Sequence, residues 1–296
     1  MNPVTRKASF NSVLVLESLS AGEPATGQDL SNNVLAQYAT GPTSIHFAYT
    51  PIPDLNSFLA VIATITADVR QKDVRPVLHI ETHGGDDGLG LASGALLDWT
   101  TLKDNLIPLN IAMRNNLLVV AAACDGGNLI NTIGPTDRAP VWGIVGPSRP
   151  MFPSDFATAF PRFYEVLLKT RNLNNAVTAL RRANSHYLDP WHFYNAELIF
   201  GLGLGQYFNT KASDPVRKSL ENEIVAESYA RGKLTQAKEP AARRFIQASL
   251  LDDLGFFEQL KTHFLMLDLY PEEAVRFPLT VAQTLEIYTA NRSALP

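Results

Sequence analysis

Residues 117–127 read Leu-Leu-Val-Val-Ala-Ala-Ala-Cys-Asp-Gly-Gly, and this stretch does most to decide the fold. The unbroken apolar run before Cys124 is typical of a strand that is buried on both faces of a parallel sheet. A second stretch, residues 76–85, reads Pro-Val-Leu-His-Ile-Glu-Thr-His-Gly-Gly. Cys124 and His83 each come just past the end of such a strand and before glycines. Because ligands bind beyond the carboxyl ends of parallel strands, we expect both side chains at one site.

The rest of the chain places these two stretches in an alternating pattern of strands and helices. The expected strands cover residues 12–18, 44–50, 75–82, 117–123 and 140–146. Helices are expected between and after them, and the helix over 55–71 has apolar residues at three- and four-residue steps. This alternation predicts an α/β fold with a mostly parallel central sheet that helices cover on both faces.

The composition changes after about Tyr207, and from Ser213 onward the chain is charged and mostly helical in pattern. We therefore expect a first domain over residues 1–210 and a helical C-terminal extension over residues 211–296. The chain shows no internal repeat and no low-complexity tract.

Composition and charge exclude several classes of function. The chain has 25 basic and 29 acidic side chains and no block of lysine or arginine, so a nucleic-acid partner has no electrostatic support. No stretch approaches the ~20 apolar residues of a membrane helix. Cys124 is the only cysteine, which fits a reducing compartment, and residues 1–10 lack the apolar run of a signal peptide. We expect a cytoplasmic protein that does not bind membranes.

Neither a cofactor nor a metal is expected. The glycines of residues 88–94 have the wrong spacing for a dinucleotide-binding loop, and those of residues 201–205 are not followed by an identifiable acidic ribose ligand. The histidines are scattered, and none has metal-ligand spacing with Cys124 or a carboxylate.

The chemistry of a Cys-His pair is nucleophilic catalysis. A thiolate attacks a carbonyl, and a nearby imidazole can generate the thiolate and move the proton. The backbone N–H groups of Gly84 and Cys124 are the candidate donors to the developing oxyanion. Glu81 is a candidate to orient His83, because residues two apart on a strand share a face; a backbone carbonyl from the loop after the first strand would serve equally well. A lone cysteine or histidine is more often structural. The hypothesis therefore depends on both residues occurring at strand ends, each followed by glycines.

The order of these motifs resembles that of the caspase-type cysteine peptidases. A strand ends in His-Gly, and 41 positions after the histidine a later apolar strand ends in Ala-Cys. The chain is most similar to the bacterial CHAT-type peptidases, in which a strand ending in glycine and two helices follow. The matching helix residues are Phe163, Tyr164 and Leu167 in the first helix and Ala176, Ala179 and Arg181 in the second. The resemblance covers roughly residues 10–205.

The resemblance implies a caspase-like three-layer fold in which His83 is the catalytic histidine, Cys124 the nucleophile and Gly84 the oxyanion-hole glycine. It implies a cysteine endopeptidase that cleaves a specific protein substrate through an acyl-thioester. It also implies control by a regulatory or sensor protein, in a bacterial antiviral defence or cell-death setting.

The chain departs from the caspase pattern where substrate specificity is set. The pattern Gln-Ala-Cys-Arg-Gly is here Ala-Ala-Cys-Asp-Gly over residues 122–126, so the preferred residue before the scissile bond does not follow from it. Asp125, Ser148 and Arg149 are candidates for substrate binding. A turn role explains Asp125 better than substrate binding does, and Arg149 is equally a surface charge.

Two other functional hypotheses remain open. The caspase-like scaffold could be a binding or regulatory module without catalysis, or the thiol could serve another enzyme such as an acyl transferase. A homo-oligomer is also compatible with the sequence. Whether His83 and Cys124 come within hydrogen-bond reach discriminates between the enzyme and the binding module.

Overall fold

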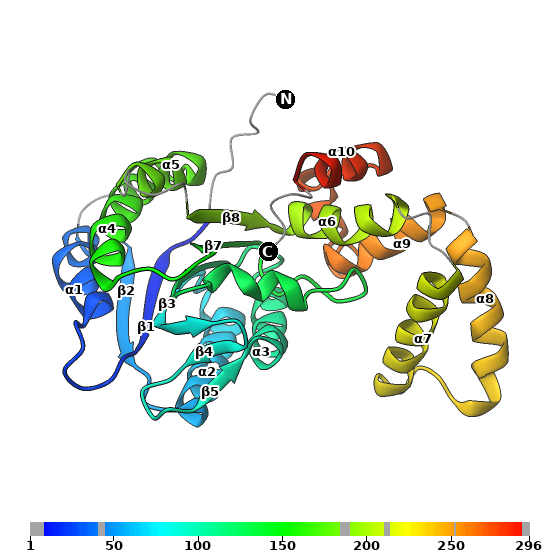
Figure 1. Ribbon diagram of the computed structural model, residues 1–296, viewed down its shortest axis with the longest axis horizontal. Helices are drawn as coiled ribbons and strands as arrows, with labels where there is room; N and C mark the ends of the chain where they lie inside the picture. The colour runs from blue at the N-terminus through cyan, green and yellow to red at the C-terminus, as the bar shows by residue number, and fades with distance from the viewer. Residues whose placement is uncertain (1–8, 41–44, 184–189, 210–213, 252, 292–296) are drawn as a thin grey trace. The chain divides into compact units, whose positions relative to one another are not determined.

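The structure, a computed structural model, describes residues 9–40, 45–183, 190–209, 214–251 and 253–291 (Figure 1). These residues form two compact units. The first contains residues up to 132 together with 140–195, and the second contains 133–139 together with 196–291. The division therefore differs from the expected boundary at residue 210.

The first unit is built around one mixed sheet with the strand order β2-β1-β3-β6-β7-β8. Its strands are β1 (Ser12–Ser18), β2 (His46–Pro51), β3 (Pro76–Gly85), β6 (Leu118–Ala122), β7 (Gly143–Pro147) and β8 (Trp191–Asn195). In this order β2, β1, β3, β6 and β7 pair in parallel, and β8 runs antiparallel to β7. The expected α/β class with a mostly parallel central sheet is thus confirmed.

Helices cover the two faces of this sheet, so the first unit has three layers (Figure 1). One face carries α2 (Leu55–Lys72) and α3 (Trp99–Ala112), and the other carries α1 (Thr26–Asn33), α4 (Pro153–Thr170) and α5 (Leu173–Ala183). Short 3-10 helices, η1 (Leu35–Tyr38) and η2 (Gly126–Thr132), complete the unit. Asp54 and Asp98 start α2 and α3 because each carboxylate accepts a hydrogen bond from an unpaired amide of the first turn.

Two strands differ from the sequence expectations. Strand β3 continues through His83 to Gly85 and folds back into a hairpin with β4 (Gly88–Gly90), which β5 (Leu96–Asp98) extends. Strand β8 lies outside the expected strands; its residues pair along β7 and close that edge of the sheet. Helix α3 contains Pro108 and continues to Ala112, because buried leucines on both sides of the proline keep its last turns packed.

The described elements of the second unit are all helical. They are α6 (Ala196–Asn209), α7 (Asp214–Ala230), η3 (Gln236–Lys238), α8 (Glu239–Leu251), α9 (Asp253–Phe264), η4 (Pro271–Arg276) and α10 (Val281–Asn291). Helix α6 belongs here because its Phe200 packs against Phe257 and Phe264 of α9. The composition change near residue 207 therefore falls inside a helix of this unit. No helix in the described ranges combines the length and the hydrophobicity needed to cross a membrane.

Candidate active site

The sheet brings His83 and Cys124 to the same edge. Strands β3 and β6 are parallel neighbours with Glu81 opposite Ala122, so the residues that follow leave the sheet side by side. Gly84 shows how closely they approach: a Cβ atom at this position would lie 2.0 Å from the carbonyl oxygen of Cys124 and 3.0 Å from Cβ of Ala123. Only glycine fits, because the backbones at residues 84 and 124 are in direct contact.

Both reactive side chains line one cavity of about 150 Å³. Its other lining residues are Leu19, Glu23, Pro24, Thr26, Glu81, Thr82, Ala122, Met151, Pro153 and Phe156. Most of these are apolar, and the polar ones come from the last half of β3, from the loop that follows β1 and from the first residue of α1. The structure therefore brings together the expected pair and Glu81, but it does not line this cavity with the described residues Asp125, Ser148 or Arg149.

Each member of the pair is hydrogen-bonded to a different group. His83 Nε2 lies 2.7 Å from Glu23 Oε1, and the imidazole is 63% exposed. The sulfur of Cys124 accepts from the amide of Met151 at 3.3 Å and contacts the Met151 carbonyl oxygen at 3.6 Å. In the described part of the chain, no hydrogen bond joins Cys124 to His83. Contacts of this kind are often long without substrate and shorten when it binds.

Comparison with known proteins identifies no family for this chain. No protein-family model matches the chain, and no curated protein matches it significantly. Within the described ranges, no three His, Cys, Asp or Glu side chains converge as ligands for a metal ion. The interpretation of the site therefore depends on the geometry and chemistry of its residues.

The backbone around Cys124 offers a hydrogen-bond donor. Among the described residues, no group accepts from the amide of Cys124. This amide is thus available to an oxyanion. The second expected donor, Gly84, pairs with Leu89 in the β3–β4 hairpin.

Glu81 does not contact His83, although it shares its face of β3. It is buried, its Oε2 lies 3.0 Å from Nε2 of His79, and its Oε1 accepts from the hydroxyl of Thr26. His79 in turn contacts the hydroxyl of Tyr164 through Nδ1 at 3.2 Å. Burial, followed by the charge of Glu81, raises the pKa of Tyr164, so this phenol stays protonated. A buried carboxylate needs partners at close range, and His79 supplies one.

The group that contacts His83 is Glu23, which the sequence analysis did not single out. It lies in the loop after β1, and its Oε2 accepts from the amide of Ser20 at 2.6 Å. That hydrogen bond, together with His83, lowers the pKa of Glu23, so the carboxylate is ionised at neutral pH. The sequence could have indicated Glu23 by its position, because the loop that carries it follows the strand next to β3. The sequence analysis considered only a backbone carbonyl of that loop as a partner for His83.

Both sides of this loop are anchored to buried carboxylates. Glu17, at the end of β1, accepts from the amides of Gly27 at 2.7 Å and Gln28 at 3.3 Å, so it satisfies free amides in the first turn of α1. Tyr49 donates to the other oxygen of Glu17 at 2.7 Å, and burial and this carboxylate raise the pKa of Tyr49. Thr26 is held by Glu81. These bonds fix the start of α1 and hence the loop that carries Glu23.

The remaining candidates connect the loops around Cys124. Asp125 has a left-handed backbone with φ 53°, and its amide donates to the carbonyl of Arg149 at 3.5 Å. The amide of Ser148 donates to the carbonyl of Pro190 at 3.0 Å. The turn after Cys124 is therefore tied to the loop after β7, which also brings the backbone of Met151 to the sulfur. Burial and the nearby charge of Asp86 raise the pKa of Asp125.

Proposed function

We propose that the first unit is a caspase-like cysteine endopeptidase, most similar to the bacterial CHAT-type peptidases, with Cys124 as nucleophile and His83 as proton carrier. One observation supports this most strongly: the backbone contact between Gly84 and Cys124 sets both reactive side chains on one cavity at the carboxyl edge of the sheet. The parallel order of β1, β3, β6 and β7 is compatible with such a fold.

The residues divide the chemistry as follows. The Cys124 thiolate attacks the carbonyl carbon of the scissile peptide, and the amide of Cys124 stabilises the oxyanion, with Gly84 as the second candidate donor. His83, protonated, gives its proton to the leaving amine, and the acyl-thioester forms. Water then attacks the thioester while His83 accepts its proton, which releases the acid and regenerates the Cys124 thiolate beside a protonated His83. Glu23 orients the imidazole through its contact with Nε2.

Two contacts must change before this reaction begins. The sulfur has to leave both the amide and the carbonyl oxygen of Met151, and the exposed imidazole of His83, still oriented by Glu23 through Nε2, has to approach it. These rearrangements support a regulated enzyme with few protein substrates, which by analogy works beside a sensor protein in bacterial defence or cell death in the cytoplasm. A partner that displaces the loop around Met151 would switch the site on.

A peptide library and an electrophilic peptide probe test the proposal at neutral pH. The wild-type chain is expected to cleave a subset of peptides and to be labelled at Cys124. Cys124→Ala abolishes both, and His83→Ala lowers the rates by about 10²–10⁴. His46→Ala, which changes an exposed histidine of β2, is the matched control and leaves both rates unchanged.

The second candidate is a binding module without catalysis, and the contact of the Cys124 sulfur with Met151 in place of His83 favours it. The same experiment separates the two. If Cys124 is not labelled, or if His83→Ala is labelled as fast as wild type, the endopeptidase proposal is refuted.

A further inference from the structure

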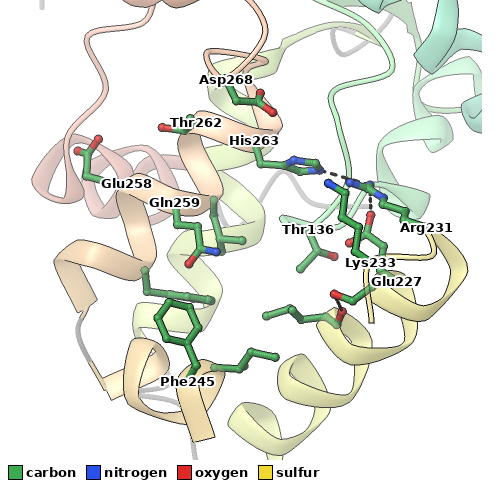
Figure 2. A pocket seen from close by; sticks show the side chains of 15 residues that line it. Thr136, Glu227, Arg231, Lys233, Phe245, Glu258, Gln259, Thr262, His263 and Asp268 are labelled. Carbon is green, nitrogen blue, oxygen red and sulfur yellow. Dashed lines mark hydrogen bonds and ion pairs between the residues drawn. The ribbon is translucent and has the colours of Figure 1, made fainter. Parts of the chain in front are cut away.

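The second unit contains a cavity of about 540 Å³ between α7, α8 and α9 (Figure 2). This volume lies within the range of small-molecule sites, about 300–1,000 Å³. Its walls come from α7, the turn after it, α8, α9 and Thr136 of the 133–139 segment. The cavity is separate from the Cys124 cavity, and nothing in the proposed peptidase chemistry uses it.

Part of the cavity wall is apolar. The apolar side chains of the lining are Ile224, Phe245, Ile246, Phe256 and Leu260. Phe256 and Leu260 are buried, whereas Phe245 is 67% exposed although it is a large aromatic residue. Figure 2 shows Phe245 at the end of the cavity away from Arg231 and Lys233. Because an exposed aromatic side chain costs free energy in water, this end favours an apolar group.

The rest of the lining is polar and carries charges of both signs. Arg231 forms an ion pair with Glu227, and Arg138, just outside the lining, forms one with Asp268 at 2.5 Å. Glu258, the third lining carboxylate, forms an ion pair with Lys261. No carboxylate of the described residues forms an ion pair with Lys233, so its ammonium group is the lining cation left for a ligand.

His263 lies beside the cations of the polar lining. Burial comes first, and the charges of Arg138 and Arg231 add to it; together they lower the pKa of His263 to about 4. The imidazole is thus neutral at pH 7 and accepts from Arg231 at 3.4 Å, as the dashed line in Figure 2 shows. The cations beside His263 would attract a negative group of a ligand, whereas Asp268 would act against it.

We propose that this cavity binds a small carboxylic acid with an apolar chain or ring. The carboxylate accepts hydrogen bonds from the ammonium group of Lys233 and from the remaining N–H donors of Arg231, and the apolar part lies against Phe245 and the other apolar lining residues. A charge-assisted hydrogen bond to a carboxylate explains why an acid is preferred over an alcohol of the same length.

Isothermal titration of the full chain with decanoate, decanol and decylammonium tests the inference. Decanoate is expected to bind roughly tenfold tighter than decanol, and decylammonium more weakly than either. Lys233→Gln brings decanoate down to the affinity of decanol. Lys238→Gln, which removes an exposed lysine of η3 outside the cavity, leaves the preference intact. Phe245→Ser weakens decanoate and decanol alike.

Thermal unfolding of each variant without ligand shows whether it folds as wild type, which is expected because Lys233 and Phe245 are exposed. The inference is overturned if decanoate fails to bind at about 1 mM, because a Kd of that size corresponds to a binding free energy of only ~4 kcal/mol. It is also overturned if the three probes bind equally, or if Lys233→Gln keeps the preference for the acid. Peptidase activity is not a readout here, so this result is independent of the proposed function.

Discussion

Replacing Gly84 by alanine tests the contact on which the candidate site depends. The added Cβ would lie 2.0 Å from the carbonyl oxygen of Cys124, whereas real Cβ contacts are essentially never closer than 3.0 Å. The two backbones must therefore separate by at least about 1 Å, and the atoms that move are backbone atoms with no rotamer to relieve the clash. Overpacking of this kind costs about 1–3 kcal/mol of unfolding free energy. A displacement of ~1 Å at a reacting group lowers the rate by about 10²-fold.

Gly85 provides the matched control, because a Cβ there meets no atom within 4 Å. Urea unfolding and the rate of Cys124 labelling by an electrophilic peptide are measured for wild type, Gly84→Ala and Gly85→Ala. We expect Gly84→Ala to lose both stability and reactivity, and Gly85→Ala to remain within about 0.5 kcal/mol of wild type. The reasoning is refuted if the two variants unfold at the same urea concentration and react equally fast.

Three further predictions concern single titratable groups. Glu23→Gln removes the charge that faces His83 and should slow Cys124 labelling about threefold to tenfold at unchanged stability, since the pair is partly exposed; an unchanged rate would exclude an orienting role. Asp125→Asn keeps the left-handed backbone but removes a carboxyl group whose pKa is raised in the fold, so the variant should be more stable than wild type at pH 7. This gain in unfolding free energy should shrink as the pH falls and the wild-type carboxyl becomes protonated. A gain that stays constant in urea unfolding from pH 7 to about 3 contradicts this prediction. His263 has a pKa of about 4 in the fold against an ordinary value of 6.5, so the free energy of unfolding should fall as the pH drops through this window. His263→Gln should reduce that loss by roughly 2–3 kcal/mol. If the unfolding free energies of wild type and variant change equally with pH, His263 titrates normally.

The sheet could be predicted from the sequence because its signals are local. Strand β1 covers the expected residues 12–18, and the apolar run before Cys124 forms β6 within the expected limits. Unbroken runs of β-branched and small apolar residues have few other stable places than a covered parallel sheet. Strand β8 was missed because its tyrosine, tryptophan and phenylalanine indicate packing equally well, and only the pairing with β7 makes the segment a strand.

The partners within the site could not be predicted, because they depend on how loops fold over the sheet. Glu81 shares a strand face with both His79 and His83, and the sequence does not say which imidazole it meets. Burial decides: the carboxylate lies inside the unit beside His79, and the exposed His83 is left to Glu23 from a loop 60 positions earlier. The contact between Cys124 and Met151 likewise depends on the course of the loop after β7.

The short segment 133–139 has a consequence for how this protein can be cut or rearranged. It is inserted between η2 and β7, yet its Ala139 amide donates to the carbonyl of Phe264, and Arg138 is paired with Asp268. A gene truncated after Asn195 would therefore leave this segment without its partners, exposing an unsatisfied amide and an unpaired guanidinium in the shortened product. The two units are interlaced in sequence, so a recombinant fragment or a natural gene fusion that is to keep the helical unit whole must carry both pieces.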